Sequence, residues 1–274
     1  MSASPGLFFV SQGAGPASEQ SSTRLTFELR AGYQIVVPGA IGRLDRLRLL
    51  IDTGSIPSMV DRRIAKKLGV AVQPGDTIAF GQQSHVLNTV LPGIRLGSLR
   101  ADGVRAGVGD LSFLHGVDAI LGLDVLSRSS FSIDYEARQL VFGPVVASEP
   151  TVRLEFAPPF LTAQLVLAGQ HVRLLVDTGS RRLLLFEHRV GDRFPRWPVH
   201  GEQLVYHLSG ASVLRRVYLP SLEAGATTFE RIEGFMSDAP VDGYPPEIDG
   251  VLGIRALAAK HAEFDFDRNR LGLR

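Results

Sequence analysis

The sequence contains no cysteine among its 274 residues, and this absence excludes three kinds of chemistry. Disulfide bonds, a thiol nucleophile and a cysteine-ligated metal site all require that side chain. It leaves the cellular compartment open, because a cysteine-free protein folds in any redox environment. The seven histidines show no metal-binding spacing such as His-Glu-x-x-His. We therefore expect neither a metal ion nor another cofactor.

The sequence also lacks an excess of charge of either sign and lacks long apolar runs. The 29 basic and 28 acidic residues are interspersed, so no broad surface for nucleic acid or acidic lipid is expected. No apolar run approaches the roughly 20 residues that span a bilayer. The first residues combine a short apolar patch with Gly, Ser, Pro and Gln and carry no basic segment, which is typical of a flexible lead-in. The sequence predicts no nucleic-acid partner and no integral membrane segment.

The chain does contain a repeated phrase. "LLIDTGS" at 49–55 returns as "LLVDTGS" at 174–180, an offset of 125 residues (177 − 52). Three later blocks repeat in the same order: "TVLPGIRLGSLRADGVRAGVGD" matches a segment 128 residues on, and "DAILGLDVL" and "SIDYEARQLVF" match segments 131 residues on. Repeated blocks in one order with small insertions indicate a duplicated domain. The chain length allows two lobes of ordinary size.

The repeat sets the expected domain organisation. We predict a flexible lead-in at 1–23, an N-terminal lobe at 24–143, a linker at 144–151 and a C-terminal lobe at 152–274. The linker "GPVVASEP" contains proline and small residues, which suit an exposed connection.

Within each predicted lobe the pattern is mostly that of β-structure. Short runs of Val, Ile, Leu and Phe are separated by Gly, Pro, Asn and Asp, and two of them predict hairpins with tips at Gly81–Ser84 and Ser209–Ser212. The segment 58–70 has apolar residues at helical spacing followed by Gly69, and predicts a helix. Its counterpart, 183–194, is less regular and contains a glycine.

Each aspartate of the repeated phrase follows a strand that reads as buried. "RLLI" precedes Asp52 and "RLLV" precedes Asp177, and Thr, Gly and Ser follow both. Glycine lets backbone N–H groups approach the carboxylate, the serine hydroxyl offers a further donor, and the threonine hydroxyl reaches across a two-fold axis. If the lobes face each other about such an axis, the two carboxyl groups meet, share one proton and titrate at separate pKa values.

These residues resemble the aspartic proteases of the pepsin and retroviral kind, and most closely the bacterial retropepsin-like, single-chain, two-lobe enzymes. Ile120-Leu121-Gly122 and Val251-Leu252-Gly253 resemble the family's second signature, two apolar residues and a glycine packed beneath the turn. The resemblance implies a mainly β, acid-protease fold of two β-barrel-like lobes about a pseudo-two-fold axis, with a few short helices. It implies an aspartic endopeptidase in which Asp52 and Asp177 activate one water molecule.

The resemblance also assigns supporting and substrate-binding residues. Those expected to support the aspartates are Thr53, Gly54, Ser55, Thr178, Gly179 and Ser180. Those expected to contact substrate from the hairpin tips are Gly81, Gln82, Gln83, Ser84, Ser209, Gly210, Ala211 and Ser212. Ser55 and Ser180 are pepsin-like, since the retroviral type usually has alanine there, and they predict an acidic pH optimum. Arg181 and Arg182 are unusual beside such a turn and hint at acidic substrate positions.

Two other functions remain open at this stage. A catalytically silent peptide-binding protein would keep the fold without needing either carboxylate, and an autoinhibited hydrolase would have its substrate site covered by the N-terminal segment or a partner. In every case the expected partner is a peptide or protein, and the chain is expected to be a monomer. Family habit places it in the periplasm or cell envelope, with a cytoplasmic site not excluded.

Overall fold

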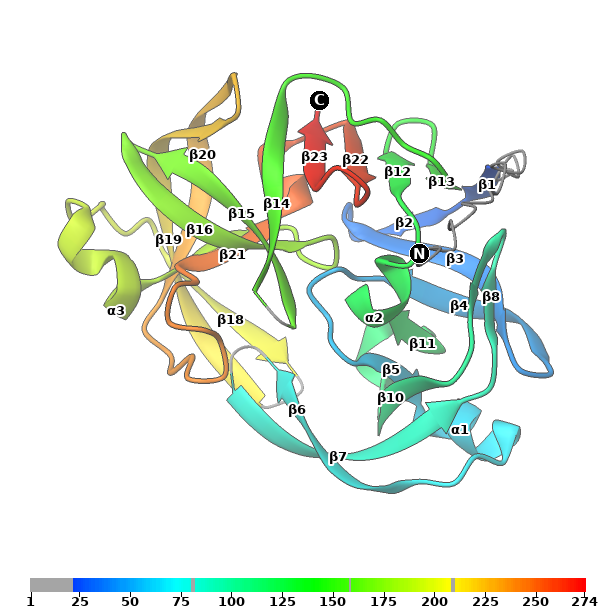
Figure 1. The fold of residues 1–274 in the computed structure, drawn as a ribbon. Helices are drawn as coiled ribbons and strands as arrows, with labels where there is room; N and C mark the ends of the chain where they lie inside the picture. The colour runs from blue at the N-terminus through cyan, green and yellow to red at the C-terminus, as the bar shows by residue number, and fades with distance from the viewer. Residues whose placement is uncertain (1–21, 80–81, 158, 208–209) are drawn as a thin grey trace, which may run out of the picture.

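The computed structural model describes residues 22–79, 82–157, 159–207 and 210–274. Figure 1 shows two β-rich lobes, with the first half of the chain forming one lobe and the second half forming the other. A shared sheet of short strands joins them. The mainly β, two-lobe architecture expected from the sequence is confirmed.

The N-terminal lobe is built on a ten-stranded sheet. Its strand order is β6-β7-β10-β5-β11-β4-β3-β8-β9, and β2 pairs with β3. The strands are β2 (Glu28–Arg30), β3 (Gln34–Ile41), β4 (Leu44–Ile51), β5 (Ser58–Asp61), β6 (Gln73–Ala79), β7 (Gln82–Leu91), β8 (Ile94–Leu96), β9 (Leu99–Ala101), β10 (Val104–Gly109) and β11 (Ala119–Leu121). The helices are α1 (Arg62–Leu68), α2 (Leu123–Leu126) and a 3₁₀ turn (Ser112–Leu114).

The C-terminal lobe repeats this arrangement in the order β18-β19-β20-β17-β21-β16-β15. The strands are β15 (Phe160–Leu167), β16 (Gln170–Asp177), β17 (Leu183–Phe186), β18 (Glu202–His207), β19 (Gly210–Ala224), β20 (Thr227–Ser237) and β21 (Gly250–Gly253). The helices are α3 (Glu187–Val190) and two 3₁₀ turns (Gly191–Arg193 and Ile254–Leu257).

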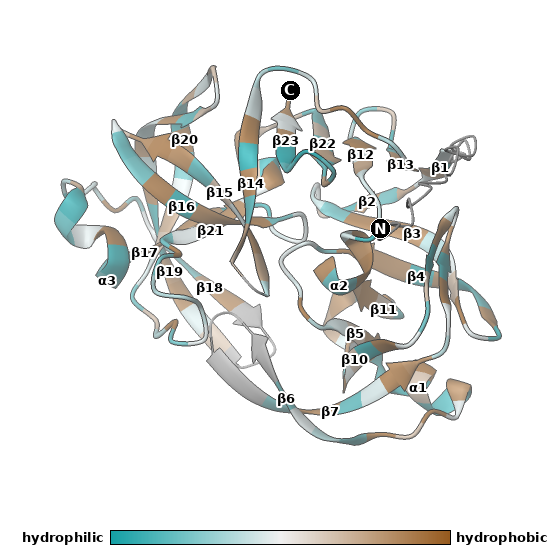
Figure 2. Ribbon diagram, in the orientation of Figure 1, coloured by the Kyte–Doolittle hydropathy of each residue, from teal (hydrophilic) through white to brown (hydrophobic). Residues whose placement is uncertain are grey.

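The same four-strand pattern surrounds each aspartate. In the N-terminal lobe β11 runs parallel to β4 and antiparallel to β5, and β5 runs parallel to β10. In the C-terminal lobe β21, β16, β17 and β20 repeat those directions. Parallel neighbours buried on both faces need apolar runs, which the "RLLI" and "RLLV" segments provide. Figure 2 shows the apolar residues of the N-terminal lobe on β4, β11 and α2.

A row of strands joins the lobes in the order β1-β13-β12-β22-β23-β14, and it continues into the C-terminal lobe because β14 also pairs with β15. These are β1 (Thr23–Thr26), β12 (Phe131–Asp134), β13 (Gln139–Phe142), β14 (Thr151–Ala157), β22 (His261–Asp265) and β23 (Arg270–Leu273). The central antiparallel pair places Ser132 opposite Glu263, and the sequence repeat makes those two residues equivalent (263 − 132 = 131). The pseudo-two-fold axis therefore passes through this pair.

Aromatic packing closes the join between the lobes. Phe131 of β12 and Phe264 of β22 stack with ring centroids 4.5 Å apart, and both are fully buried. Phe142 and Phe266 pack against them. Aromatic pairs of this kind add to the stabilisation that comes from the buried apolar area itself, so the two lobes share one apolar core.

The predicted helix at 58–70 is wrong in its first four residues. Residues 58–61 form β5, which is buried throughout and lies between β10 and β11. Asp61 then caps α1 by accepting the backbone N–H of Arg63, and Gly69 ends the helix in the left-handed conformation. Burial on both faces favours a strand where the apolar spacing alone favoured a helix.

The predicted hairpins are present, but their turns lie earlier than expected. The register pairs Ala79 with Gln82 and His207 with Gly210. The connections at 80–81 and 208–209, which include Gly81 and Ser209, lie outside the described residues. Residues 82–84 and 210–212, predicted at the tips, belong to β7 and β19 instead. Strand pairing continues further toward each tip than the polar composition indicated.

The domain boundaries predicted from the repeat remain a prediction. The first described strand, β1, begins at Thr23, and β14 begins at Thr151. The predicted lead-in lies almost wholly outside the described residues.

Within the described ranges, no helix has both the length and the apolar character needed to cross a membrane.

Candidate active site

Asp52 and Asp177 stand at the ends of equivalent strands. Asp52 follows β4 directly and donates its backbone N–H to Leu121 of β11 at 3.0 Å. Asp177 is the last residue of β16 and is opposite Gly253 in the parallel ladder with β21. The parallel strands carry both aspartates to the place where the two lobes meet.

The two turns, residues 52–55 (the first turn) and 177–180 (the second turn), are bonded to each other by their threonines. The hydroxyl of Thr53 donates to the carbonyl oxygen of Val176 at 2.8 Å, and that of Thr178 donates to Ile51 at 3.1 Å. Each hydroxyl also accepts the backbone N–H of the other threonine at 3.1 Å. Both threonines are buried, so four mutual hydrogen bonds fix the separation of the turns.

Two glycines allow the carboxyl groups of Asp52 and Asp177 to come into contact. A Cβ atom added to Gly54 would lie 2.5 Å from Cγ of Asp177, and one added to Gly179 would lie 2.5 Å from Cγ of Asp52. No side chain fits in either place. The N–H of each glycine donates to Oδ1 of the aspartate in its own turn, at 2.9 Å for Asp52 and 2.7 Å for Asp177.

Both aspartates have a raised pKa. Burial raises the pKa of Asp52, although a hydrogen bond with Asp177 and the N–H groups of Gly54 and Ser55 oppose the shift. The pKa of Asp177 lies well above its usual range, because of burial first and then the charge and hydrogen bond of Asp52. Two carboxyl groups in contact titrate as a pair, and this pair holds a proton far more readily than an isolated aspartate.

The serine hydroxyls do not contact the carboxylates in the way the sequence indicated. The hydroxyl of Ser55 donates to the carbonyl oxygen of Pro57 at 3.3 Å, and that of Ser180 accepts the N–H of Arg182 at 3.2 Å. Both serines act on the aspartates through their backbone N–H groups instead. Their hydroxyls shape the chain that leaves each turn.

The glycine of the second signature lies against each turn. A Cβ atom on Gly122 would overlap the carbonyl oxygen of Ser55, and one on Gly253 would lie 2.6 Å from that of Ser180. Leu123 donates its N–H to Ser55 at 3.0 Å, and Gly253 donates to Arg182 at 2.8 Å. The apolar-apolar-glycine segments therefore support the turns from behind.

This geometry agrees with a comparison against known families. Residues 37–125 match the family model described as aspartyl protease. The matched region includes the first turn and Ile120-Leu121-Gly122, so the resemblance to aspartyl proteases is confirmed on residues of the N-terminal lobe. The match supports a protease-type function. No curated protein matches the chain.

The hairpin residues expected to bind substrate are placed less completely. Ala211 is exposed and Ser212 is buried, while Gln82, Gln83, Ser84 and Gly210 are described as strand residues only. Their contact with substrate remains a prediction, as it does for Gly81 and Ser209.

Within the described ranges, no cluster of three or more histidine, aspartate or glutamate residues could hold a metal ion.

One supporting pair escaped the sequence reasoning. Ser58 donates its hydroxyl to Asp124 at 2.6 Å and accepts the N–H of Gly122 at 2.9 Å, which ties β5 to the segment behind the first turn. Asp124 belongs to neither signature. Its place two residues after the second signature was the available signal.

Proposed function

We propose that the protein is a single-chain aspartic endopeptidase, which hydrolyses peptide bonds with a water molecule held between Asp52 and Asp177. The observation that carries this proposal is the contact of two carboxyl groups from different lobes, held by mirrored hydrogen bonds between the turns. A protein that only bound peptides would gain nothing from keeping two acids in contact, because like charges brought together cost free energy.

We assign the general-base role to Asp52 and the general-acid role to Asp177, whose pKa is raised further. Asp52, the more easily ionised, removes a proton from water as the water oxygen attacks the scissile carbonyl carbon. Asp177, which holds its proton more strongly, donates it to the carbonyl oxygen. When the tetrahedral intermediate collapses, the C–N bond breaks and the leaving amine takes the proton from Asp52. One hydroxyl of the intermediate returns its proton to Asp177, which restores the pair.

Digestion of a peptide library between pH 3 and 8 tests the proposal. We expect a bell-shaped profile with its maximum below neutrality, because activity needs one ionised and one protonated carboxyl group. Asp52→Asn and Asp177→Asn should each lower kcat by about 10² to 10⁴-fold. Asp267→Asn, which changes an exposed aspartate, is the matched control and should leave kcat unchanged.

Two outcomes of the digestion would contradict the proposal. Peptide binding without turnover by the unmodified protein would replace the proposal with a catalytically silent peptide-binding function. A maximum above neutrality would contradict the assigned protonation states.

The proposed state is a monomer, since both aspartates come from one chain. Sedimentation of the active protein tests this. The proposed location in the periplasm or cell envelope depends on the family resemblance alone, and cell fractionation tests it.

A further inference from the structure

The two lobes differ at equivalent positions beneath their hairpins. In the N-terminal lobe Gly107 is opposite Met59 in the ladder of β10 and β5, and Gly75 is opposite Val86 in the hairpin β6–β7 (the first hairpin). In the C-terminal lobe the corresponding pairs are Phe235 with Leu184, and Gln203 with Leu214 in the hairpin β18–β19 (the second hairpin). Met59 and Leu184 each stand seven residues after an aspartate. Two glycines in one lobe therefore stand where the other has a phenylalanine and a glutamine.

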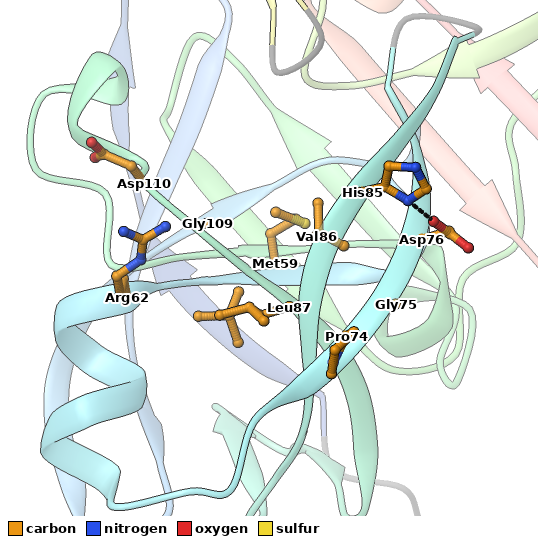
Figure 3. Close-up of a pocket in the computed structure, with 11 residues that line it drawn as sticks. Met59, Arg62, Pro74, Gly75, Asp76, His85, Val86, Leu87, Gly109 and Asp110 are labelled. Atoms are coloured by element: carbon orange, nitrogen blue, oxygen red, sulfur yellow. Dashed lines mark hydrogen bonds and ion pairs between the residues drawn. The ribbon is translucent and has the colours of Figure 1, made fainter.

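An open pocket lies in the N-terminal lobe, and the side chains of Met59 and Asn88 occupy the space beside the two glycines. The volume of the pocket is about 770 Å³, and Met59, Val86 and Val108 supply apolar lining together with the backbone of Gly75 and Gly109. Figure 3 shows the side chains of Met59 and Val86 directed into the space between β7 and the strands behind it. The pocket is large enough for a bulky side chain and has an apolar floor.

Charged groups stand only at the edges of this pocket. Arg62 and Asp110 lie at one side, and His85, hydrogen-bonded to Asp76 at 2.5 Å, lies at the other (Figure 3). All four residues are exposed, so water screens their charges. The pocket selects for apolar bulk more than for charge.

In the C-terminal lobe the position equivalent to Gly107 is filled by Phe235. The Phe235 ring is buried in a cluster with Leu184 and Leu214. The guanidinium of Arg182 lies over that ring, 5.4 Å from its centroid, and its Nε donates to Oε1 of Gln203 at 3.4 Å. An arginine thus links the second turn to the base of the second hairpin.

Arg182 keeps unused hydrogen-bonding capacity. Within the described part of the chain, no carboxylate forms an ion pair with Arg182 or with the exposed Arg181 beside it. Burial and the charge of Arg181 lower the pKa of Arg182, while Tyr33 and Glu233 oppose that shift. A half-buried guanidinium with free N–H donors favours a carboxylate partner. The residue at the same place after the first turn is Pro57, which offers neither charge nor donor.

From this difference we infer that the substrate is a peptide recognised asymmetrically: a bulky apolar residue enters the pocket beneath the first hairpin, and an acidic residue on the other side of the scissile bond pairs with Arg182. The inference depends on the proposed function for the location of the scissile bond. Positions related by the pseudo-two-fold axis lie on opposite sides of the aspartate pair, so their ligands lie on opposite sides of the bond that is cut. Arg182 is then a specificity-determining residue that takes no part in the chemistry.

Paired peptides that differ only by Glu for Gln, or by Leu for Ala, test each side in turn. We expect a Glu preference at one position and a preference for the larger apolar residue at a position across the scissile bond. Arg182→Gln should remove the Glu preference, lowering kcat/KM for the Glu peptide about tenfold while sparing the Gln peptide. Arg182→Glu should reverse the preference toward Lys. Arg100→Gln removes the same charge from β9, which lies at the far edge of the sheet from the first hairpin. It should change neither the Glu preference nor the preference for the larger apolar residue.

Val86→Phe tests the other side by reducing the volume of the open pocket. It should remove the preference for Leu over Ala and leave the Glu preference intact, and a thermal unfolding curve would establish that the variant is folded. Cleavage with no Glu preference, or a Glu preference that survives Arg182→Gln, would overturn the inference and leave the protease proposal standing.

If no peptide is cleaved, the same Glu and Gln peptides can be titrated against the protein by fluorescence anisotropy. Tighter binding of the Glu peptide that depends on Arg182 would support the asymmetric site without catalysis. Equal binding of both peptides, or none of either, would overturn it.

Discussion

The first and second turns share Asp-Thr-Gly-Ser and differ in what holds them from behind. Behind the first, the hydroxyl of Ser58 joins Asp124 and Gly122. Behind the second, the position of Ser58 is taken by Leu183, which is fully buried. The position of Asp124 is taken by Arg255. Its guanidinium lies 4.8 Å from the centre of the Tyr135 ring, and its Nε donates to the carbonyl oxygen of Gly32, in the other lobe, at 3.3 Å.

The difference shows where duplication leaves freedom to change. Each threonine at the axis bonds to the opposite turn, so a change in either one disturbs both lobes. Ser58 and Leu183 contact mainly their own lobe, and a polar link in one can be replaced by apolar packing in the other. The symmetry is therefore strict at the axis and relaxed one layer behind it.

The largest effect should come from the layer behind the turns. Leu183→Ala should lower the free energy of unfolding by about 2–5 kcal/mol, because it opens a cavity in a packed core. Ser58→Ala should cost about 1–3 kcal/mol, because it leaves the Gly122 N–H and Asp124 without a partner. Urea unfolding measures both. Ser58→Thr keeps the hydroxyl and is the control; equal losses for Leu183→Ala and Ser58→Thr would contradict the distinction between apolar and polar support.

The axis itself should respond symmetrically. Thr53→Val and Thr178→Val each remove a hydroxyl that both donates and accepts across the axis, so each should cost about 1–3 kcal/mol. The double variant should cost less than the sum, because the four hydrogen bonds form one network. Thr→Ser variants keep the hydroxyl and serve as controls. A loss confined to one of the two threonines would show that the turns are not held mutually.

The smallest effect distinguishes the two aspartates. An aspartate whose pKa is raised in the folded state leaves stability unchanged below its unfolded pKa and costs stability as the pH rises toward the folded pKa. Asp177→Asn should therefore stabilise the protein at pH 7, with no gain near pH 3. Asp52→Asn should gain less, because the pKa of Asp52 is raised less. A larger gain for Asp52→Asn in urea unfolding would reverse the assigned roles.

The repeat in the sequence predicted the parts of the site that lie on the axis. Asp52, Asp177 and their glycines could be placed because identical letters at one offset must fold alike. The start of α1 could not be predicted, because residues 58–61 carry a spacing compatible with a helix and only their burial between β10 and β11 decides for a strand.

The pocket beneath the first hairpin could not be predicted, although the sequence shows a difference between the lobes there. At the offset of 128, Gly75 aligns with Gln203 and Gly107 with Phe235. Glycine against a large side chain at a matched position indicates a difference in volume. Whether the space stays open depends on which neighbours fill it, and that depends on ladder registers that the sequence does not determine.

The row of strands between the lobes has a consequence for how the chain could be divided. β12 and β22 cover each other's edges through four paired positions, so a polypeptide cut in the linker would leave each fragment with an unprotected β-edge beside exposed phenylalanines. Such edges recruit other chains. Fragments made separately should therefore aggregate or bind each other, and mixing them during refolding should restore a nicked but complete molecule.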